Sequence, residues 1–287
     1  MLLTDKISTK APVLFSCSTF GDLATFKLAL PRIKKYLQPA KLILSVPDRD
    51  FERFKLEVTG QDWIDLRKDS DYFDSEKYER LHTILTARGK GSKVNWYLQQ
   101  LIKIEMLRTL EPDQLGVIWD SDTIPLRPIQ FLSPQNKLKY FVSDEFHEPY
   151  FITNENILNI SKQIECSFIA QCLPVYGYMV DSLISKLSKD GEWWIHIINN
   201  LTEKHVLAFS EYEFLGSYIW KTYPAVTELN YSSWERNGFE KSFFYRDMEK
   251  FLEKMSSKYA FLAIEKIERR SIIKRIMKKL KSLLRVA

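Results

Sequence analysis

The sequence predicts an α/β fold built on a mostly parallel sheet, and three observations support this prediction. Apolar runs alternate with amphipathic segments along the first 130 residues, the pattern of strands joined by helical crossovers. A composition of 45% hydrophobic and 14% aromatic residues is sufficient for a large core. No stretch of about eighteen uncharged apolar residues occurs, so we expect no membrane-spanning helix.

The first elements follow one another regularly. The apolar run "APVLFSCST" predicts a buried strand, and the amphipathic segment after it predicts a helix. The pattern then repeats, and a third short strand is expected near "DWIDLR". The predicted strands are at 11–19, 41–47 and 62–67, and the predicted helices at 22–37 and 48–58. Residues 67–93 are charged and end in "ARGKGSK", which predicts a mobile surface loop.

A long helix is expected at 94–110. Its apolar positions recur at helical spacing and Pro112 ends it. The members of this apolar stripe are Val94, Tyr97, Leu98, Leu101, Ile104 and Leu107. Strands at 114–119 and 137–143 follow. We predict one domain at 1–268, with a regular first half at 1–130 and a less regular second half at 131–268.

The formal net charge of +5 is concentrated at one end of the chain. Segment 269–287 contains eight basic residues and no acidic one, and the rest of the chain has 34 basic against 37 acidic residues. The body therefore offers no general surface for polyanions, and we expect no nucleic-acid partner.

Cysteine spacing and the N-terminal sequence indicate the cellular compartment that we expect for the protein. Cys17, Cys166 and Cys172 lack metal-ligand spacing, which predicts reduced core residues of a cytosolic protein, with a reactive thiol as the alternative. The start "MLLTDKISTKAPVLF" has no long apolar core, so no signal peptide is expected.

Two carboxylates follow the predicted strand at 114–119. Asp-x-Asp triplets occur three times, at 48–50, 69–71 and 120–122, so the triplet alone carries little information. The first is expected to cap a helix and the second to lie in the charged loop. Only Asp120 and Asp122 follow a strongly apolar strand, at the end where open α/β sheets bind ligands.

Asp120 and Asp122 allow two interpretations. They could simply form the turn after the strand, through side-chain bonds to backbone amides. Alternatively they are ligands of Mn²⁺ or Mg²⁺, because these hard cations prefer oxygen ligands and bind one or two carboxylates together with substrate phosphates. Such an ion neutralises charge on a departing diphosphate.

The segment "VIWDSDTIPLRPI" resembles the metal-binding motif of GT-A-fold glycosyltransferases, which use nucleotide-sugar donors. More particularly, the chain resembles an uncharacterised bacterial family of GT-A-like proteins associated with surface polysaccharide assembly. This second resemblance rests on six segments in order: "TFGDLATFKLAL", "NWYLQQLIKIEML", "IWDSDTIPLRP", "HEPYF", "SFIAQ" and "FSEYEFLGSYI".

The resemblance implies a metal-dependent glycosyltransferase with a GT-A-like fold. The donor would be a nucleotide sugar, with a UDP-sugar expected. The acceptor would be a glycan or lipid-linked glycan in the biosynthesis of bacterial lipopolysaccharide O-antigen or capsule. The first half, 1–130, would bind the donor and the second half, 131–268, the acceptor.

Several donor-site residues are predicted around the aspartates. Trp96, Gln100 and Lys103 share one face of the 94–110 helix, roughly opposite the apolar stripe. This face would either be solvated or contact the donor. The resemblance implies that Lys103 contacts the diphosphate or sugar, for which a flexible ammonium is suitable. It also places Asp22 at the base or ribose, with helix N-capping as the alternative.

The helix expected at 211 begins with two glutamates. Ser210 and Glu213 have the spacing of a capping box, which gives Glu213 a structural role as an alternative to acceptor binding. Glu211 has no such role and is our candidate general base for an acceptor hydroxyl. If the reaction retains stereochemistry, Glu211 would only bind acceptor, and it could equally be a surface residue favoured by the helix dipole.

Histidines and aromatic residues suggest further contacts. Asp144 and His147 lie beside aromatics in "SDEFHEPYF" and could line the acceptor site, although a loop histidine is often only solvated. His196 is expected to be a satisfied core histidine. His205 could supply a third metal ligand.

The basic end predicts a membrane contact. Apolar residues in 269–287 recur at helical spacing among lysines and arginines, which is typical of an amphipathic helix on an anionic membrane surface. A helix packed on the body and a nucleic-acid tail are the alternatives, and the lack of interleaved aromatics weakens the second. We expect a cytoplasmic protein bound peripherally to the inner face of the membrane.

Two other functions remain open. Haloacid-dehalogenase-type phosphohydrolases also place Asp-x-Asp after a strand, but near the N-terminus and with threonine or valine where Ile124 stands here. A non-enzymatic membrane- or partner-binding module is the second alternative.

Overall fold

The computed structural model describes residues 11–188, 191–242 and 245–265 of the 287-residue chain. These residues form two compact units from interleaved segments. The larger unit contains described residues of 11–17, 39–120 and 130–231, and the smaller unit those of 18–38, 121–129 and 232–265. Asp120 and Asp122 belong to different units, and the predicted domain at 1–268 with its two halves stays a prediction.

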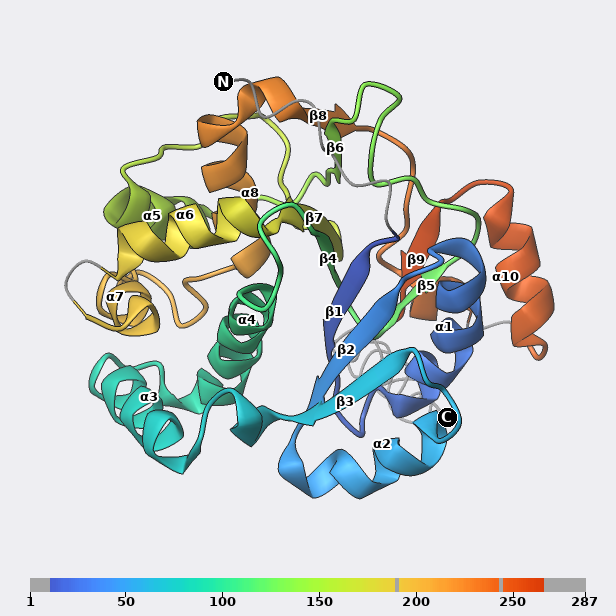
Figure 1. Cartoon of the computed structure of the whole chain (residues 1–287), viewed down its shortest axis with the longest axis horizontal. Helices are drawn as coiled ribbons and strands as arrows, with labels where there is room; N and C mark the ends of the chain where they lie inside the picture. The colour runs from blue at the N-terminus through green and yellow to red at the C-terminus, as the bar shows by residue number, and fades with distance from the viewer. Residues whose placement is uncertain (1–10, 189–190, 243–244, 266–287) are drawn as a thin grey trace, which may run out of the picture. The chain divides into compact units, whose positions relative to one another are not determined.

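A five-stranded sheet is the centre of the larger unit (Figure 1). Its strand order is β3-β2-β1-β4-β7, in which the first four strands are parallel and β7 runs antiparallel to β4. In register, Phe15 pairs with Ile43 on one side and with Ile118 on the other. The strands are β1 (Val13–Cys17), β2 (Lys41–Val46), β3 (Ile64–Lys68), β4 (Leu115–Trp119) and β7 (Cys172–Tyr176). The predicted α/β class with a mostly parallel sheet is confirmed.

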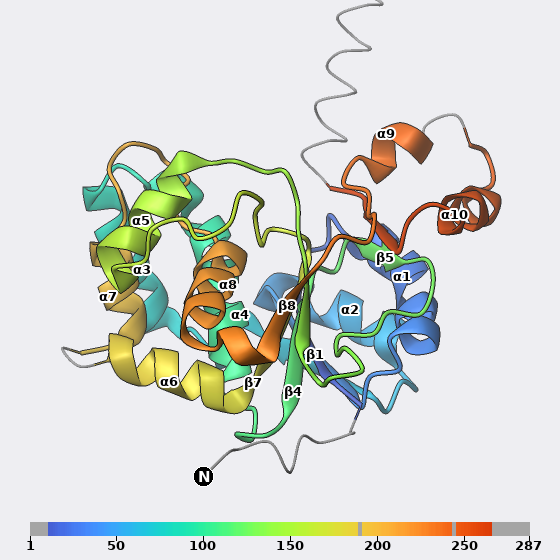
Figure 2. The ribbon, with the colours of Figure 1, turned by 90° about the horizontal axis from the view of Figure 1, so that it is seen from above.

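Helices cover both faces of this sheet. Every residue of β1, β4 and β7 is buried, as expected for continuous apolar strands with two covered faces. Figures 1 and 2 show α2 on one side of the sheet and α4 on the other. The helices of the unit are α2 (Phe51–Val58), α3 (Ser75–Ala87), α4 (Val94–Leu107), α5 (Glu148–Leu158), α6 (Gly177–Leu187), α7 (Trp193–Asn199) and α8 (Glu211–Thr222).

Shorter elements complete the larger unit. The predicted strand at 137–143 is β6 (Leu138–Phe141), which pairs in parallel with β8 (Thr227–Asn230). Single-turn 3₁₀ helices occur at Asp48–Asp50, Asp69–Asp71, Gly91–Lys93 and Pro224–Val226.

The predicted mobile loop at 67–93 is wrong, because most of it is the helix α3. Asp74 caps the helix by accepting a hydrogen bond from the Lys77 amide at 2.9 Å. Leu81 and Leu85, one turn apart, are fully buried, while the charged residues before them, Glu76, Glu79 and Arg80, are exposed. The burial of Leu81 and Leu85 therefore stabilises a helix whose average composition is typical of a loop.

The smaller unit contains the predicted first helix, α1 (Leu23–Tyr36), which contacts a two-stranded antiparallel sheet. Ile124 pairs with Leu262 in this sheet, and Arg32 forms an ion pair with Glu249 at 2.6 Å. The remaining elements are β5 (Thr123–Pro125), α9 (Gly238–Ser242), α10 (Met248–Ser256) and β9 (Phe261–Ala263).

Cys17, Cys166 and Cys172 are all free thiols, and Cys17 and Cys172 are buried as predicted, whereas Cys166 is only half-buried and is not a core residue. In the part of the chain that the structure describes, no helix is both long and apolar enough to cross a bilayer. The predicted amphipathic helix at 269–287 lies outside the described residues.

Candidate active site

Asp120 lies at the point of the sheet where strand order reverses. It directly follows β4, whose neighbour β1 is the first strand, while β2 and β3 lie on the other side of β1. Its amide donates to the Gln171 carbonyl at 3.0 Å, which fixes the backbone as the strand ends. The carboxyl ends of β1 and β4 meet here, and this is where open α/β sheets bind ligands.

Three charged side chains meet beside this strand end, and we call them the acid–lysine cluster: Lys103, Asp120 and Glu211. The Lys103 ammonium donates to Asp120 Oδ1 at 2.5 Å and to Glu211 Oε1 at 2.7 Å. Their side chains are 9%, 20% and 4% exposed, respectively. The alternatives of a solvated Lys103 and a surface Glu211 are therefore wrong, since the first turn of α8 covers this face of α4.

Neighbouring polar groups hold the cluster in place. Gln100 lies one turn before Lys103 on α4, and its side-chain oxygen accepts from the Glu211 amide at 3.1 Å. Its side-chain nitrogen donates to the Trp96 carbonyl at 3.2 Å. Gln100 thus satisfies an amide at the start of α8 that has no partner within the helix.

Ser210 is the N-cap of α8, as predicted, and accepts from the Glu213 amide at 3.4 Å. The Glu213 side chain does not complete the predicted capping box. Its carboxylate instead accepts from the Ser167 hydroxyl at 2.7 Å and the Phe168 amide at 3.0 Å. Glu213 is 1% exposed, so it ties α8 to the segment before β7.

The cluster has one positive charge for two carboxylates. Burial raises the pKa of Glu211, Lys103 opposes this rise, and Asp120 adds to it. Burial lowers the pKa of Lys103, but the carboxylates of Asp120 and Glu211 outweigh burial and leave this pKa above its usual value. With all three groups ionised, the cluster has a net charge of −1 in a largely buried place.

This arrangement fits a divalent cation. The excess negative charge favours one, carboxylate oxygens are the ligands that Mg²⁺ and Mn²⁺ prefer, and Asp120 is the most exposed member of the cluster. Among the described residues, no group of three or more His, Cys, Asp or Glu side chains has a metal-binding arrangement. Ligands beyond one or two carboxylates would therefore come from substrate phosphates and water.

Asp22 and Asp122 belong to the smaller unit. Asp22 occupies the N-cap position of α1, but its side chain makes no capping bond and instead accepts from the Thr19 hydroxyl at 2.7 Å. The capping alternative for its side chain is therefore wrong. Asp122 is half-buried and immediately precedes β5, and its carbonyl accepts from the Ile264 amide at 2.9 Å.

The carboxyl edge of the sheet also includes Asp69, which the sequence pattern predicts to lie in a charged loop. Asp69 directly follows β3 and accepts from the Ser45 hydroxyl at 2.6 Å. Burial raises its pKa to about 6, and its charge contributes to the raised pKa of Cys17 at the end of β1. The signal was its position after "DWIDLR", which is a weak strand pattern. Asp48 does not cap α2 and instead accepts from the Ser70 hydroxyl at 2.6 Å.

Aromatic rings surround the predicted acceptor residues. The His147 ring lies 4.3 Å from Tyr150 and 4.8 Å from His205, and its Nε2 is 2.8 Å from the Leu207 carbonyl. Trp96 stacks on Tyr150 at 6.4 Å. Tyr150 therefore lies against both Trp96, a predicted donor residue, and His147, a predicted acceptor residue.

The loop before α5 presents exposed groups beside these rings. Asp144 is exposed, and Phe146 is 68% exposed with its ring 5.0 Å from Phe151. His205 Nδ1 accepts from the Leu207 amide at 3.0 Å, so His205 lies beside His147 and its role as a third metal ligand remains a prediction.

Residues 7–250 match the model of a protein family described as a family of unknown function, DUF6492. The chain belongs to the DUF6492 family. No curated protein matches this DUF6492 chain.

Three solved structures with similar folds are glycosyltransferases by name. Mouse xyloside xylosyltransferase 1 has 10% identity and a TM-score of 0.45, covering 90% of this chain and 98% of its own. The galactosyltransferase LgtC has 8% identity and a TM-score of 0.41, with 88% and 86% covered. The PaToxG glycosyltransferase has 9% identity and a TM-score of 0.42, with 92% and 84% covered. At these values the likenesses assign no activity, substrate or residue to the DUF6492 chain.

Proposed function

We propose that this protein is a metal-dependent glycosyltransferase that transfers a sugar from a nucleotide sugar, UDP-linked, to a glycan or lipid-linked glycan of bacterial surface polysaccharide. The observation that carries the proposal is the acid–lysine cluster at the switch point of the sheet. Asp120, Lys103 and Glu211 combine excess negative charge, oxygen ligands and a lysine at the strand end where such sheets bind substrates.

The proposed donor-binding site is based on the charged side chains at the end of β4. Asp120 and Asp122, separated by one serine in the sequence, are the proposed ligands of Mn²⁺ or Mg²⁺. When bound, the cation would stabilise the negative charge of the leaving diphosphate. Lys103 keeps Asp120 oriented and adds positive charge near that phosphate. Trp96, Gln100 and Asp22 remain proposed donor contacts.

Glu211 is better suited to orient Lys103 than to act as a general base. A general base must reach the hydroxyl proton that it removes. The Glu211 side chain is 4% exposed, and its Oε1 accepts from the Lys103 ammonium at 2.7 Å. The burial of Glu211 therefore argues against the catalytic role predicted for it.

The acceptor would bind at the exposed surface before α5. Sugars place their C–H faces on aromatic rings and their hydroxyl groups on carboxylates, and Phe146, His147 and Asp144 offer both kinds of group. Glu213 is already bonded to Ser167 and Phe168, so acceptor binding by Glu213 would require these bonds to break.

A thermal-shift measurement tests this proposal. UDP at about 100 times its Kd should stabilise the full chain by about 2.7 kcal/mol, which raises the unfolding midpoint by about 5 °C. The shift should need Mn²⁺ or Mg²⁺ and disappear with EDTA, because the cation connects the carboxylates to the diphosphate. The matched control is uridine, which lacks the diphosphate and should give no metal-dependent shift.

The thermal-shift measurement and a phosphatase assay together separate the alternatives. Absence of a shift with any nucleotide diphosphate, with or without metal, would contradict the transferase and favour a non-enzymatic binding module. Release of inorganic phosphate from phosphomonoesters without sugar transfer would favour the haloacid-dehalogenase-type phosphohydrolase.

We also propose that segment 269–287 holds the enzyme at an anionic membrane, where a lipid-linked acceptor would be available. The proposal rests on the eight basic residues among helically spaced apolar ones, each worth about 1 kcal/mol near such a surface. Deleting 269–287 should abolish co-sedimentation with vesicles of anionic phospholipid and leave the UDP shift intact. Equal sedimentation of the truncated and full chains would refute this role.

A further inference from the structure

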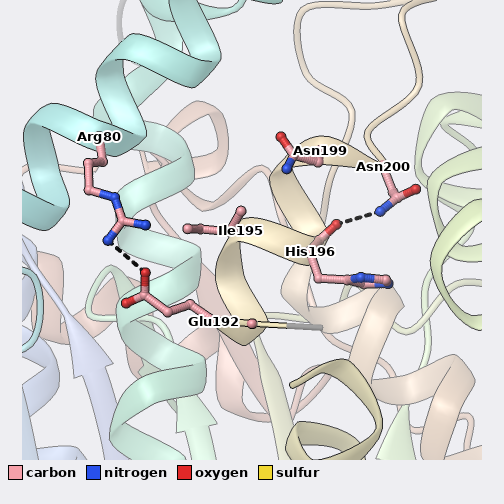
Figure 3. Close-up of a pocket in the computed structure, with 7 residues that line it drawn as sticks. Arg80, Glu192, Ile195, His196, Asn199 and Asn200 are labelled. Atoms are coloured by element: carbon pink, nitrogen blue, oxygen red, sulfur yellow. Dashed lines mark hydrogen bonds and ion pairs between the residues drawn. The ribbon is translucent and has the colours of Figure 1, made fainter. Parts of the chain in front are cut away.

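A pocket of about 460 Å³ lies on the larger unit between α3 and α7 (Figure 3). Its volume falls in the range of roughly 300–1,000 Å³ that is usual for small-molecule sites. Nothing in the proposed reaction uses it. The side chains that line it are those of Arg80, Glu192, Ile195, His196, Asn199 and Asn200.

One face of α7 and its N-cap provides most of this lining. Glu192, Ile195 and Asn199 recur at intervals of three and four residues, so they lie along the same side of the helix. Figure 3 shows Ile195 between Arg80 on one side and Asn199 on the other. The apolar side chain of Ile195 is therefore flanked by polar side chains.

The charges of the pocket cancel each other. Arg80 forms an ion pair with Glu192 Oε2 at 2.7 Å, and its guanidinium lies 5.5 Å from the Trp194 ring. An anionic ligand would compete with Glu192 for the arginine, and a cationic ligand would compete with Arg80 for the glutamate. The pocket therefore suits a neutral ligand.

The remaining polar groups can both donate and accept hydrogen bonds. His196, predicted to be a core histidine, is half-buried and lines the pocket instead. Among the described residues, the side chains of His196 and Asn199 have no hydrogen-bonding partner. Asn200 donates to the His196 carbonyl at 2.8 Å, which leaves its own side-chain oxygen as an acceptor.

We propose that this pocket is a second carbohydrate site, which binds a neutral sugar residue of a glycan away from the reacting end. A sugar ring has an apolar C–H face that would cover Ile195, and hydroxyl groups that donate and accept at Asn199, Asn200 and His196. The inference rests on the proposed function for the choice of a glycan. Such a site would favour long acceptors over short ones.

Direct binding tests the site without turnover. The full chain is titrated with maltohexaose, mannohexaose and N-acetylchitohexaose, and binding is followed by calorimetry and saturation-transfer NMR. At least one hexasaccharide should bind with a Kd in the millimolar range or tighter. Replacing both polar side chains, His196→Ala with Asn199→Ala, should weaken that Kd at least tenfold. The control Gln135→Ala, an exposed amide before β6, should leave it unchanged.

A second variant guards against a folding defect. Asn199 is exposed and its carbonyl is held by Arg88 at 3.0 Å, so Asn199→Trp should fold and fill the pocket mouth. It should reduce saccharide binding while the metal-dependent UDP shift stays unchanged. Absence of binding by all three hexasaccharides, or equal binding by both variants and the native chain, would overturn the second site. Saccharide binding without any UDP shift would instead leave the site standing and contradict the proposed transferase.

Discussion

Replacing Asp120 with asparagine should reduce sugar transfer by about 10³-fold or more. Asparagine keeps the shape of the side chain but removes the charge that a cation needs, and the Lewis-acid contribution of such a cation is several kcal/mol. Because each 1.36 kcal/mol corresponds to a tenfold change in rate, a loss of about 4 kcal/mol gives this factor. Transfer is measured as nucleotide release from a panel of nucleotide sugars in the presence of Mn²⁺.

The folded state should survive this change, which separates a catalytic effect from a structural one. Lys103 keeps Glu211 as its partner at 2.7 Å, and the net charge of the cluster becomes zero. The unfolding midpoint should therefore stay within a few degrees of the native value, while the metal-dependent UDP shift disappears.

The matched control for this variant is Asp113→Asn, an exposed aspartate just before the same strand, β4, which should behave as the native chain. Asp122→Ala should also abolish transfer. Full activity in the Asp120 or Asp122 variant would remove the proposed mechanism.

Replacing Lys103 with methionine should destabilise the protein by about 3–5 kcal/mol, because the buried Glu211 and the partly buried Asp120 lose the cation between them. The effect corresponds to a drop of about 6–9 °C in the unfolding midpoint. Methionine preserves the unbranched shape of the side chain, so packing on α4 changes little. The control Lys204→Met removes a lysine that is 62% exposed and should change the midpoint by only a fraction of this amount.

The instability of Lys103→Met should depend on pH in a defined direction. Without the ammonium, burial and the neighbouring Asp120 both hold the folded-state pKa of Glu211 above its unfolded value. A group with a raised folded-state pKa loses stability as pH increases, because the unfolded chain releases the proton more readily. The deficit against the native chain should therefore be larger at pH 7 than at pH 5.

A second substitution identifies the cause of this instability. Adding Glu211→Gln to Lys103→Met removes one of the two carboxylates and should recover part of the lost stability and flatten the pH dependence. Equal deficits at pH 5 and pH 7 would show that lost packing, and not unpaired charge, is responsible.

The sequence alone determined the four parallel strands of the central sheet and the position of Asp120, but not the antiparallel strand β7. The apolar runs of β1, β2 and β4 are long enough to specify buried strands without outside information. Chain direction then places the residue after β4 at the carboxyl edge of a parallel sheet. By contrast, α3 was not predicted, because Leu81 and Leu85 are the buried residues that anchor its largely polar sequence.

Only the tertiary structure decided what Lys103 and Glu211 do. The polar face of α4 has the spacing of a solvated helix face, and Glu211 has the pattern of an exposed first-turn glutamate. They are 108 residues apart in the chain, yet the start of α8 lies against α4 and buries both of them beside Asp120. Once water is excluded, two carboxylates and one ammonium must satisfy each other, and local sequence patterns contain no information on which distant groups share a buried space.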